Sequence, residues 1–401
     1  MNLGKVFIYR IFQRVMHLLI PFFPYREPKL LDGISEVIDT FKSNNIQRVM
    51  LVTGKRVRGC GLTYELEEKL KENHILYAIY DGTLPNPTSN NVEEARNLYL
   101  ENNCQAIIAF GGGSVMDCAK ALGARIVCPK KSLKKMQGLI KIRKKIPLLI
   151  AVPTTAGSGS ETTVASVIID SDTNHKYVIN DFCLIPKYAL MDPKVTVSLP
   201  KYITAITGMD ALTHAVEAYI GKSKTRMSKK ASEEAVKLIV ENLEKAYLNG
   251  EDLEARKNML YASYLAGTAF TKSYVGYIHA VAHTLGGRYG VAHGLANAVL
   301  LPHVLRAYGA SVNKSLAKLA KVARLVEEGT SNEEAAEAFI SYIEEMNRHM
   351  EIPTKLDCVK KKDIHEMAKL AAKEANPLYP VPVLWDAKQL EKLYLLVCCN
   401  N

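Results

Sequence analysis

The eight cysteines of this 401-residue chain show no Cys-x-x-Cys pair and no spacing typical of a disulfide framework. Internal repeats and low-complexity segments are absent as well. With 48% hydrophobic and 23% charged residues, the chain is expected to be globular, and long enough for two domains. Scattered cysteines without a recognisable secretion signal favour free thiols and a cytoplasmic location.

The N-terminal segment lacks an uncharged run long enough to span a bilayer. Residues 3–24 are largely apolar, but they are interrupted by Lys5, Arg10, Arg14 and His17. No small-residue cleavage site follows. We therefore expect no stable membrane insertion. Basic residues on one side would suit a helix lying on a membrane surface, but we favour a helix packed on its own chain or on a second subunit.

The chain has an excess of positive charge, +11 at pH 7, which raises the question of a nucleic-acid partner. Eight basic residues lie between Lys130 and Lys145. No aromatic residues interleave with them and no nucleic-acid-binding motif surrounds them. We interpret the run as solvated surface and expect no nucleic-acid partner.

The first half of the sequence alternates strand and helix patterns. Short apolar, often β-branched runs occur at 48–53, 75–80, 106–110 and 147–152, with stretches of helical period at 61–72 and 91–102 between them. This alternation predicts a parallel sheet covered on both faces, a Rossmann-like α/β domain. Two further runs, 163–170 and 176–179, are typical of a hairpin.

The second half is helical in pattern and lacks strand-like segments. Long periodic runs such as 228–249 and 331–350 follow a change of character near 193–200. We therefore predict an α/β dinucleotide-binding domain over 1–196, including an apolar extension at 1–28, and an all-α domain over 197–401.

Two loops in the first half have the composition of a nucleotide site. Gly111-Gly112-Gly113-Ser114 follows the strand AIIAF and begins a helix, so that backbone amides and the helix dipole can bind a phosphate. A second loop, PTTAGSGSE at 153–161, offers small hydroxyls and follows another strand. Because ligands bind at the carboxyl ends of strands in open α/β sheets, these two loops together predict a nucleotide.

Histidines and one aspartate in the helical half form a candidate metal site. Asp210 and His214 are one helical turn apart in ITGMDALTHAVEAYI, which places them on one face. Four further candidates are His279, His283, His293 and His303. Imidazole and carboxylate together suit Fe(II) or Zn(II). Spacing alone leaves open which of these histidines are ligands.

Four motifs give the chain a family resemblance. They are GGGSVMDCAKA, PTTAGSGSE, GMDALTHAVEAY and HAVAHTLGGRYGVAHGLANA, and the correspondence runs from about residue 30 to about residue 395. Together they resemble the iron-containing (group III) alcohol dehydrogenases. The resemblance implies a dinucleotide domain, a helical domain with a divalent metal, and hydride transfer between an alcohol or aldehyde and a nicotinamide cofactor. It also leads us to expect a homo-oligomer.

The resemblance assigns roles to individual positions. It implies four metal ligands: Asp210, His214, His279 and His293. His283 becomes the non-ligand histidine facing the nicotinamide, a candidate for orienting substrate or relaying protons. The positions matching those that hold or line the nucleotide are Asn86, Gly112, Gly113, Ser114, Asp117, Thr154, Thr155, Val167 and Lys176.

One position departs from the family pattern. Many members carry an acidic residue after the first long strand, where it binds the adenosine ribose hydroxyls, whereas this chain has Gly54 followed by Lys55, Arg56 and Arg58. An acid there would repel a 2′-phosphate, and its replacement beside three cations favours one. We therefore predict NADP(H) over NAD(H), with Fe(II) or alternatively Zn(II) as the metal.

Two other functions compete with this prediction. Dehydroquinate synthase and glycerol dehydrogenase are related metal- and NAD-dependent enzymes. The synthase would need a pocket rich in cationic side chains, and neither enzyme has the full four-ligand set. The pair His279 and His293, the fourth ligand Asp210 and the uncharged run VAHGLANAV argue against the synthase. The other alternative is a non-catalytic scaffold that binds a metal or a nucleotide. The complete ligand set and the complete cofactor loop argue against a protein that has lost its catalytic activity.

Overall fold

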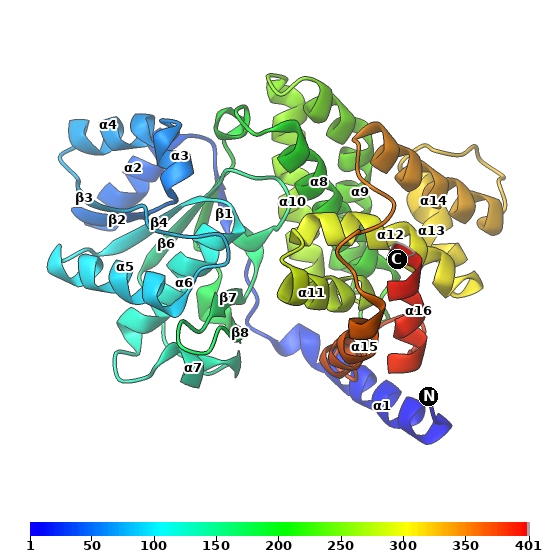
Figure 1. The fold of residues 1–401 in the computed structure, drawn as a ribbon. Helices are drawn as coiled ribbons and strands as arrows, with labels where there is room; N and C mark the ends of the chain where they lie inside the picture. Colours follow the sequence, from blue (N-terminus) through cyan, green and yellow to red (C-terminus); the bar gives the residue numbers. More distant parts are fainter. Residues whose placement is uncertain (399–401) are drawn as a thin grey trace. The chain divides into compact units, whose positions relative to one another are not determined.

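The structure is a computed structural model that describes residues 1–398 (Figure 1). The chain forms two compact units, one an α/β unit and the other helical. The α/β unit is Pro24–Ser198, and the helical unit combines Met1–Phe23 with the residues from Leu199 onward.

The α/β unit is built on a six-stranded sheet in which every pair of neighbouring strands is parallel. The strand order is β1-β9-β6-β4-β2-β3. Their bounds are β1 Lys29–Leu31, β2 Arg48–Val52, β3 Leu76–Tyr80, β4 Ala106–Gly111, β6 Leu148–Pro153 and β9 Tyr188–Leu190. β4 is buried along its whole length because helices cover both faces, as its continuous apolar sequence predicts. The predicted parallel α/β fold is confirmed.

Two helical layers sandwich this sheet, and alternate strand residues point into each layer. Val49 and Leu51 pack in one core with residues of α2 and α4, whereas Met50 packs in the other with residues of α5 and α6. The helices are α2 Ile34–Ser43, α3 Lys55–Gly59, α4 Tyr64–Glu72, α5 Ser89–Glu101, α6 Gly113–Val127 and α7 Leu133–Met136. Short 3-10 turns are η2 Ser160–Thr162, η3 Phe182–Leu184 and η4 Pro193–Thr196.

A second, three-stranded sheet lies in the same unit. Its strands are β5 Gly138–Leu139, β8 Lys176–Asn180 and β7 Ala165–Ile169, in that order. β7 and β8 are antiparallel, which confirms the predicted hairpin. The basic run 130–145 passes through α7 and β5, and seven of its eight cations are exposed.

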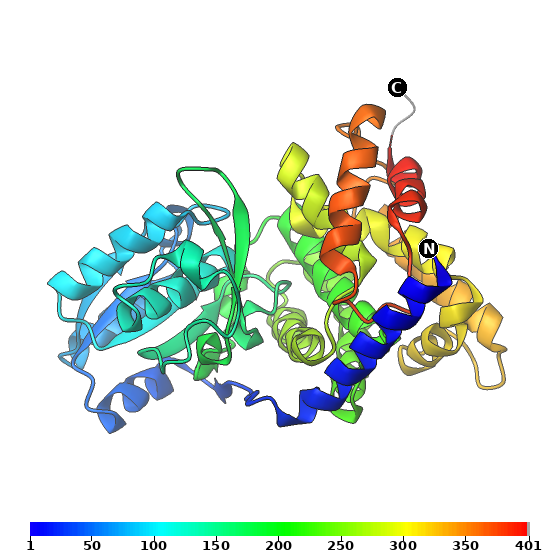
Figure 2. The ribbon, with the colours of Figure 1, turned by 90° about the horizontal axis from the view of Figure 1, so that it is seen from below.

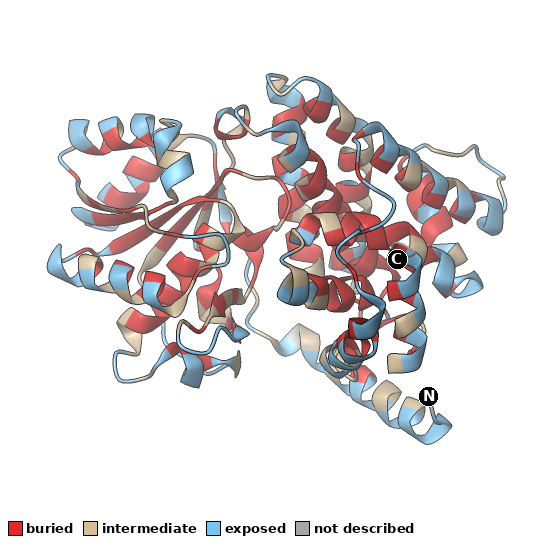
Figure 3. Cartoon of the chain, in the orientation of Figure 1, coloured by how far each residue is buried: buried red, intermediate tan, exposed pale blue. Residues whose placement is uncertain are grey.

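The helical unit contains no strand among its described residues, as its sequence period predicts. Its helices after residue 200 are α8 Lys201–Ile220, α9 Arg226–Leu248, α10 Leu253–Ser273, α11 Tyr277–Tyr289, α12 His293–Tyr308, α13 Ala310–Val322, α14 Asn332–His349, α15 Lys361–Ala375 and α16 Ala387–Val397. The core helix α8 is buried on nearly every side, which Figure 3 shows as an almost continuous red ribbon.

The N-terminal helix α1 (Leu3–Leu19), followed by the 3-10 turn η1 (Ile20–Phe22), belongs to the helical unit. The Arg10 guanidinium donates to the carbonyls of Val381 and Pro382 at 2.7 and 2.8 Å. The buried Gln13 amide donates to the carbonyls of Pro377 and Tyr379 at 3.0 and 2.7 Å. These polar contacts explain why α1 packs on the helical unit. The sequence analysis had placed residues 1–28 with the α/β domain instead. No helix among the described residues is long and apolar enough to cross a membrane.

Candidate functional site

Helix α8 presents three polar side chains in a row on one face. Asp210, His214 and Glu217 follow at intervals of four and three residues, so they project from successive turns. All three are buried in a helix that is otherwise apolar around them. Because burying charged or polar groups is costly unless they are paired or bind an ion, this row marks a functional face.

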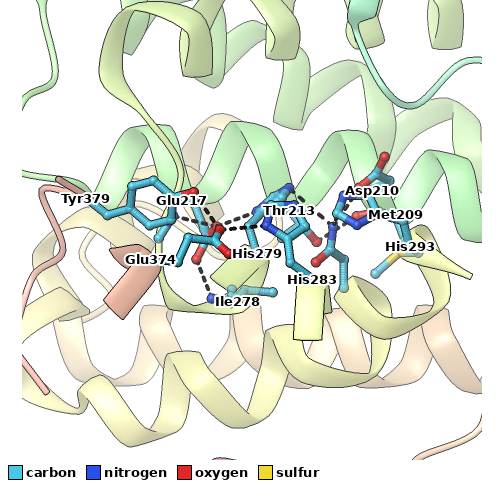
Figure 4. A network of polar contacts seen from close by, with 12 residues as sticks. Met209, Asp210, Thr213, Glu217, Ile278, His279, His283, His293, Glu374 and Tyr379 are labelled. Carbon is cyan, nitrogen blue, oxygen red and sulfur yellow. Dashed lines mark hydrogen bonds and ion pairs between the residues drawn. The ribbon is translucent and has the colours of Figure 1, made fainter. Parts of the chain in front are cut away.

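Helices α11 and α12 bring two more histidines to this face (Figure 4). His279 lies in the first turn of α11, and His293 is the first residue of α12. The approach of α12 depends on Gly294, because a Cβ atom there would lie 2.2 Å from the carbonyl oxygen of Ile206 in α8. Only glycine permits this backbone contact, which places His293 Nε2 3.5 Å from Asp210 Oδ1.

The four residues Asp210, His214, His279 and His293 each offer one ligand atom to a common point. These atoms all lie within 4.8 Å of one another. Ligand atoms at about 2.1 Å from one ion lie at most about 4.2 Å apart. The four side chains would therefore need to move only slightly closer together to bind one ion. The set is open on one side, because His293 is 42% exposed while the other three are buried.

The side chain of Asn297, one turn after His293, tests whether this set fits a cation. Its amide nitrogen lies 2.7 Å from Asp210 Oδ1, 3.3 Å from His279 Nε2 and 3.2 Å from His293 Nε2. An amide has two hydrogens, yet three acceptor atoms converge on it. Such an excess of lone pairs at one buried point is what a divalent cation satisfies, so the donor set fits a metal.

Glu217 holds His279 in one orientation. Its carboxylate accepts hydrogen bonds from the backbone N–H groups of Gly276 and Ile278, both at 2.8 Å, and lies 2.6 Å from His279 Nδ1. His279 therefore carries its proton on Nδ1, and the Nε2 lone pair faces the ligand set. Burial raises the pKa of Glu217 to about 7 and lowers that of His279 well below its ordinary value. A neutral His279 is the form that binds a metal.

His283 lies one turn beyond His279 but does not belong to the ligand set. Its Nδ1 is 2.7 Å from Glu374 Oε1, which also accepts a hydrogen bond from the Tyr379 hydroxyl at 2.8 Å (Figure 4). Burial alone would raise the pKa of Glu374, but the charge and hydrogen bond of His283 bring it below its ordinary value.

The other histidine of the sequence cluster, His303, lies further along α12 and outside the set.

In the α/β unit, the sheet reverses its winding between β2 and β4. The chain passes from β2 outward to β3 and then returns to add β4 on the other side of β2. The Thr53 hydroxyl, just after β2, donates to the carbonyl of Phe110 in β4 at 2.8 Å. Such a reversal point at the carboxyl ends of strands is where open α/β sheets bind nucleotides.

The two predicted nucleotide loops touch each other at this edge. A Cβ on Gly112 would lie 3.1 Å from Thr155 Oγ1, and one on Gly113 would lie 3.0 Å from Ser158 Oγ. The glycines therefore leave room for the second loop beside the N-terminus of α6, where free N–H groups point outward. Thr154, next to this contact, is buried, and its backbone N–H donates to the carbonyl of Gly111 at 3.1 Å.

Three more of the predicted nucleotide residues are linked to one another. The backbone N–H of Asn86 donates to Ser114 Oγ at 3.2 Å, and Asn86 Oδ1 accepts from Lys176 Nζ at 2.8 Å. Asn86 is in the left-handed region, with φ 57°, which asparagine tolerates. Val167 lies on β7, and its backbone N–H donates a hydrogen bond to the carboxylate of Asp117 in α6. Burial raises the pKa of Asp117 to about 7.

Lys120, which the sequence analysis passed over, is a buried cation beneath the second loop. Its ammonium donates to the carbonyls of Ser160, Thr163 and Ala165 at 2.6, 2.9 and 2.9 Å. Burial lowers its pKa to about 8, partly offset by the nearby carboxylates of Asp117 and Glu161. The ammonium therefore fixes the shape of the hydroxyl-rich loop.

Four residues of these sites escaped the sequence analysis, and three of them have a local signal. Glu217 follows His214 by three residues, Asn297 follows His293 by four, and Lys120 follows Asp117 by three. Each therefore shares a helical face with a predicted site residue. Glu374 has no such signal, because it is 91 residues from His283.

The three cations that follow Gly54 differ in whether they are paired with a carboxylate. Lys55 and Arg56 are exposed, but the Arg58 guanidinium is paired with Asp81 at 2.9 Å. Gly54 itself has φ −115°, and a Cβ atom there would be in ordinary contact with the carbonyl of Thr83 at 3.5 Å. A side chain at this position would therefore be tolerated.

Comparison with protein families assigns the chain. Residues 31–193 match the model of iron-containing alcohol dehydrogenase, and residues 204–396 match that of the Fe-containing alcohol dehydrogenase family, C-terminal. The chain belongs to the iron-containing alcohol dehydrogenase family. The helix α1 precedes both matched regions.

Several family members resemble this chain over most of their length. The 1,3-propanediol dehydrogenase of Klebsiella pneumoniae is 40% identical over 337 residues, covering 82% of this chain and 86% of that protein. The NAD-dependent methanol dehydrogenase of Bacillus methanolicus is 35% identical over 366 residues, covering 90% and 95%. The crystal structure of a 1,3-propanediol oxidoreductase superposes with a TM-score of 0.89 at 36% identity, covering 93% of this chain and 99% of that one.

Proposed function

We propose that this chain is a metal-dependent alcohol dehydrogenase and aldehyde reductase that transfers hydride between a primary alcohol or aldehyde and NADP(H). The observation that carries the proposal is the convergence of Asp210, His214, His279 and His293 on one point, in a member of the iron-containing family. The mixed imidazole and carboxylate set suits Fe(II), with Zn(II) as an alternative set by supply.

The helical unit contributes the metal site and the groups around the substrate oxygen. A divalent cation held by Asp210, His214, His279 and His293 supplies a Lewis acid for an alcohol or carbonyl oxygen. Glu217 keeps the Nε2 lone pair of His279 directed at the cation. The exposed edge of His293 leaves one side of the set open to a small substrate.

The α/β unit contributes the cofactor site, since nicotinamide supplies the hydride chemistry. The amides at the start of α6, around Gly112, Gly113 and Ser114, are placed to bind the pyrophosphate. Asn86 is hydrogen-bonded to Ser114 at the start of this helix, and Lys176 is hydrogen-bonded to Asn86. The hydroxyls of Thr154 and Thr155 lie on the adjoining loop.

The preference for NADP(H) rests on Gly54 and the two exposed cations after it, Lys55 and Arg56. No carboxylate is present at position 54 to bond ribose hydroxyls, and Lys55 and Arg56 are available for a 2′-phosphate. The relative from Bacillus methanolicus is described as NAD-dependent, so the preference is specific to these residues and is not a family property.

An anaerobic assay at 340 nm tests both the reaction and the cofactor. The Fe(II)-loaded protein is given butanal with NADPH or NADH, beside a chelator-treated sample. We expect metal-dependent oxidation with a higher kcat/KM for NADPH. The variant Gly54→Asp should reverse this preference by roughly tenfold or more, since the new carboxylate repels a 2′-phosphate and can accept hydrogen bonds from the ribose hydroxyls of NADH. Lys130→Gln, which makes the charge more negative by the same single unit at an exposed turn, is the control.

The outcomes separate the reaction from the cofactor preference. Faster oxidation of NADH by the unaltered protein would retain the enzyme and refute the NADP preference. Failure with both cofactors across a panel of aldehydes would refute the proposed reaction.

His283 is the residue that we propose to orient the substrate or relay its proton. Its Nδ1 is held by Glu374, which leaves Nε2 for a hydrogen bond to the substrate oxygen. We expect His283→Ala to lower kcat by roughly a hundredfold and to change the pH profile of kcat, with metal content unchanged. The control is His365→Ala, which breaks a comparable surface pair with Glu391 at 2.6 Å. An unchanged rate and pH profile would remove the role of His283.

A further inference from the structure

The helix α1, blue in Figure 2, has most of its large apolar side chains exposed. Its large exposed apolar residues are Leu3, Phe7, Ile8, Ile11, Phe12, Val15, Leu18 and Leu19. Phe7 and Leu18 are 66% and 65% exposed. At about 100° per residue these side chains cover about half of the helix circumference, along about 26 Å. We refer to this set as the outer face of α1.

The opposite face of α1 is mixed, with Val6 and Met16 half-buried beside polar side chains that already have partners. Arg10 and Gln13 donate to four backbone carbonyls of the helical unit, and His17 Nδ1 lies 3.1 Å from the carbonyl of Ser223. A helix that packs on its own protein normally buries its apolar stripe and exposes its polar one. In α1 most of the large apolar side chains are exposed and the hydrogen-bonding ones face inward, so intramolecular packing does not account for the outer face.

The charged side chains of α1 itself have one sign, and the one nearby carboxylate recorded at its start, Asp386, is paired with the N-terminal ammonium at 2.8 Å. Residues 1–26 contain no Asp or Glu. The exposed cations Lys5 and Arg14 lie at the two borders of the outer face, since helical geometry places them about 180° apart, on either side of the apolar arc. A long apolar arc with basic residues at both borders is the pattern of a helix lying in the plane of an anionic membrane surface.

We propose that α1 docks this protein on an anionic lipid surface through its outer face. The apolar side chains enter the boundary between headgroups and acyl chains, while Lys5 and Arg14 extend to the lipid phosphates. Charge favours lipid over a second copy of the chain. Two outer faces pressed together would bring Lys5 and Arg14 of both copies close, with no carboxylate in residues 1–26 to pair them.

Co-sedimentation of the full chain with phospholipid vesicles tests the proposal. The vesicles are phosphatidylcholine alone or phosphatidylcholine with phosphatidylglycerol. We expect binding to the anionic vesicles that weakens with salt. The triple variant Phe7→Gln, Ile11→Gln, Leu18→Gln should reduce the bound fraction roughly tenfold. The matched control replaces three exposed leucines elsewhere, Leu76, Leu100 and Leu248, with Gln and should bind as the unaltered protein does.

A charge variant and the oligomeric state complete the test. Lys5→Gln with Arg14→Gln should lower binding to anionic vesicles several-fold. The proposal is overturned if the unaltered protein stays in the supernatant, or if the triple variant sediments as the unaltered protein does. It is also overturned if no vesicle is bound while sedimentation velocity shows an oligomer that the triple variant dissociates, since a second copy then covers the face.

Discussion

Replacing His214 with Ala is expected to remove the metal from the purified protein and to lower kcat/KM for aldehyde reduction by about a thousandfold. The imidazole is one of the four convergent candidate ligands and is buried on α8, where it stacks on Phe270 with ring centroids 4.2 Å apart. A Lewis acid contributes several kcal/mol to the transition state, and each 1.36 kcal/mol corresponds to a factor of ten. Metal content per chain after desalting measures the first effect, and anaerobic kinetics with added Fe(II) measure the second.

The control for this variant is His303→Ala, which alters a histidine of α12 outside the ligand set. His214→Gln retains more of the side-chain volume and separates loss of a ligand from loss of packing. Circular dichroism establishes that each variant is folded. Full metal content in both His214 variants would contradict the assignment of this residue as a ligand.

Replacing Lys120 with Met is expected to lower the free energy of unfolding by about 3 kcal/mol and to weaken NADPH binding. The Lys120 ammonium donates to three backbone carbonyls of the hydroxyl-rich loop. Methionine has a similar length but no donor, and each buried acceptor left without a partner costs about 1–3 kcal/mol. Urea denaturation followed by circular dichroism measures the stability, and NADPH titration measures the affinity.

The matched control is Lys130→Met, the same replacement at an exposed position of the basic run. It should leave both quantities within error. If Lys120→Met were as stable as the unaltered protein and bound NADPH equally well, the loop would not depend on the buried ammonium.

Long apolar runs allowed four strands of the α/β unit to be predicted from the sequence. β2, β3, β4 and β6 each begin and end within about one residue of the predicted bounds, because their sequences are apolar almost throughout. The central strands β4 and β6 are also buried along nearly their whole length. β1 and β9 were not predicted. Each has three residues, too few for any period to be visible, and their pairing with each other and with β6 is a long-range contact.

The candidate metal site was only partly accessible to sequence reasoning. Helical spacing identified the pair Asp210 and His214, but the choice among the later histidines came from family resemblance. The contact that decides their positions, the backbone of Gly294 against Ile206, joins residues far apart in the chain. The orientation of α1 was equally hidden, because its inward polar face is set by carbonyls near residue 380 that no local pattern reveals.

The anchoring of α1 also bears on how the protein can be engineered. Gln13 holds the carbonyl of Tyr379, the Tyr379 hydroxyl bonds to Glu374, and Glu374 bonds to His283. The segment that α1 fixes is thus the one that supports the proposed catalytic histidine. Shortening the chain to the length of the family match, as one would to simplify expression, removes this support together with the exposed apolar residues. Surface substitutions that spare Arg10 and Gln13 would remove the exposed apolar side chains and keep this support in place.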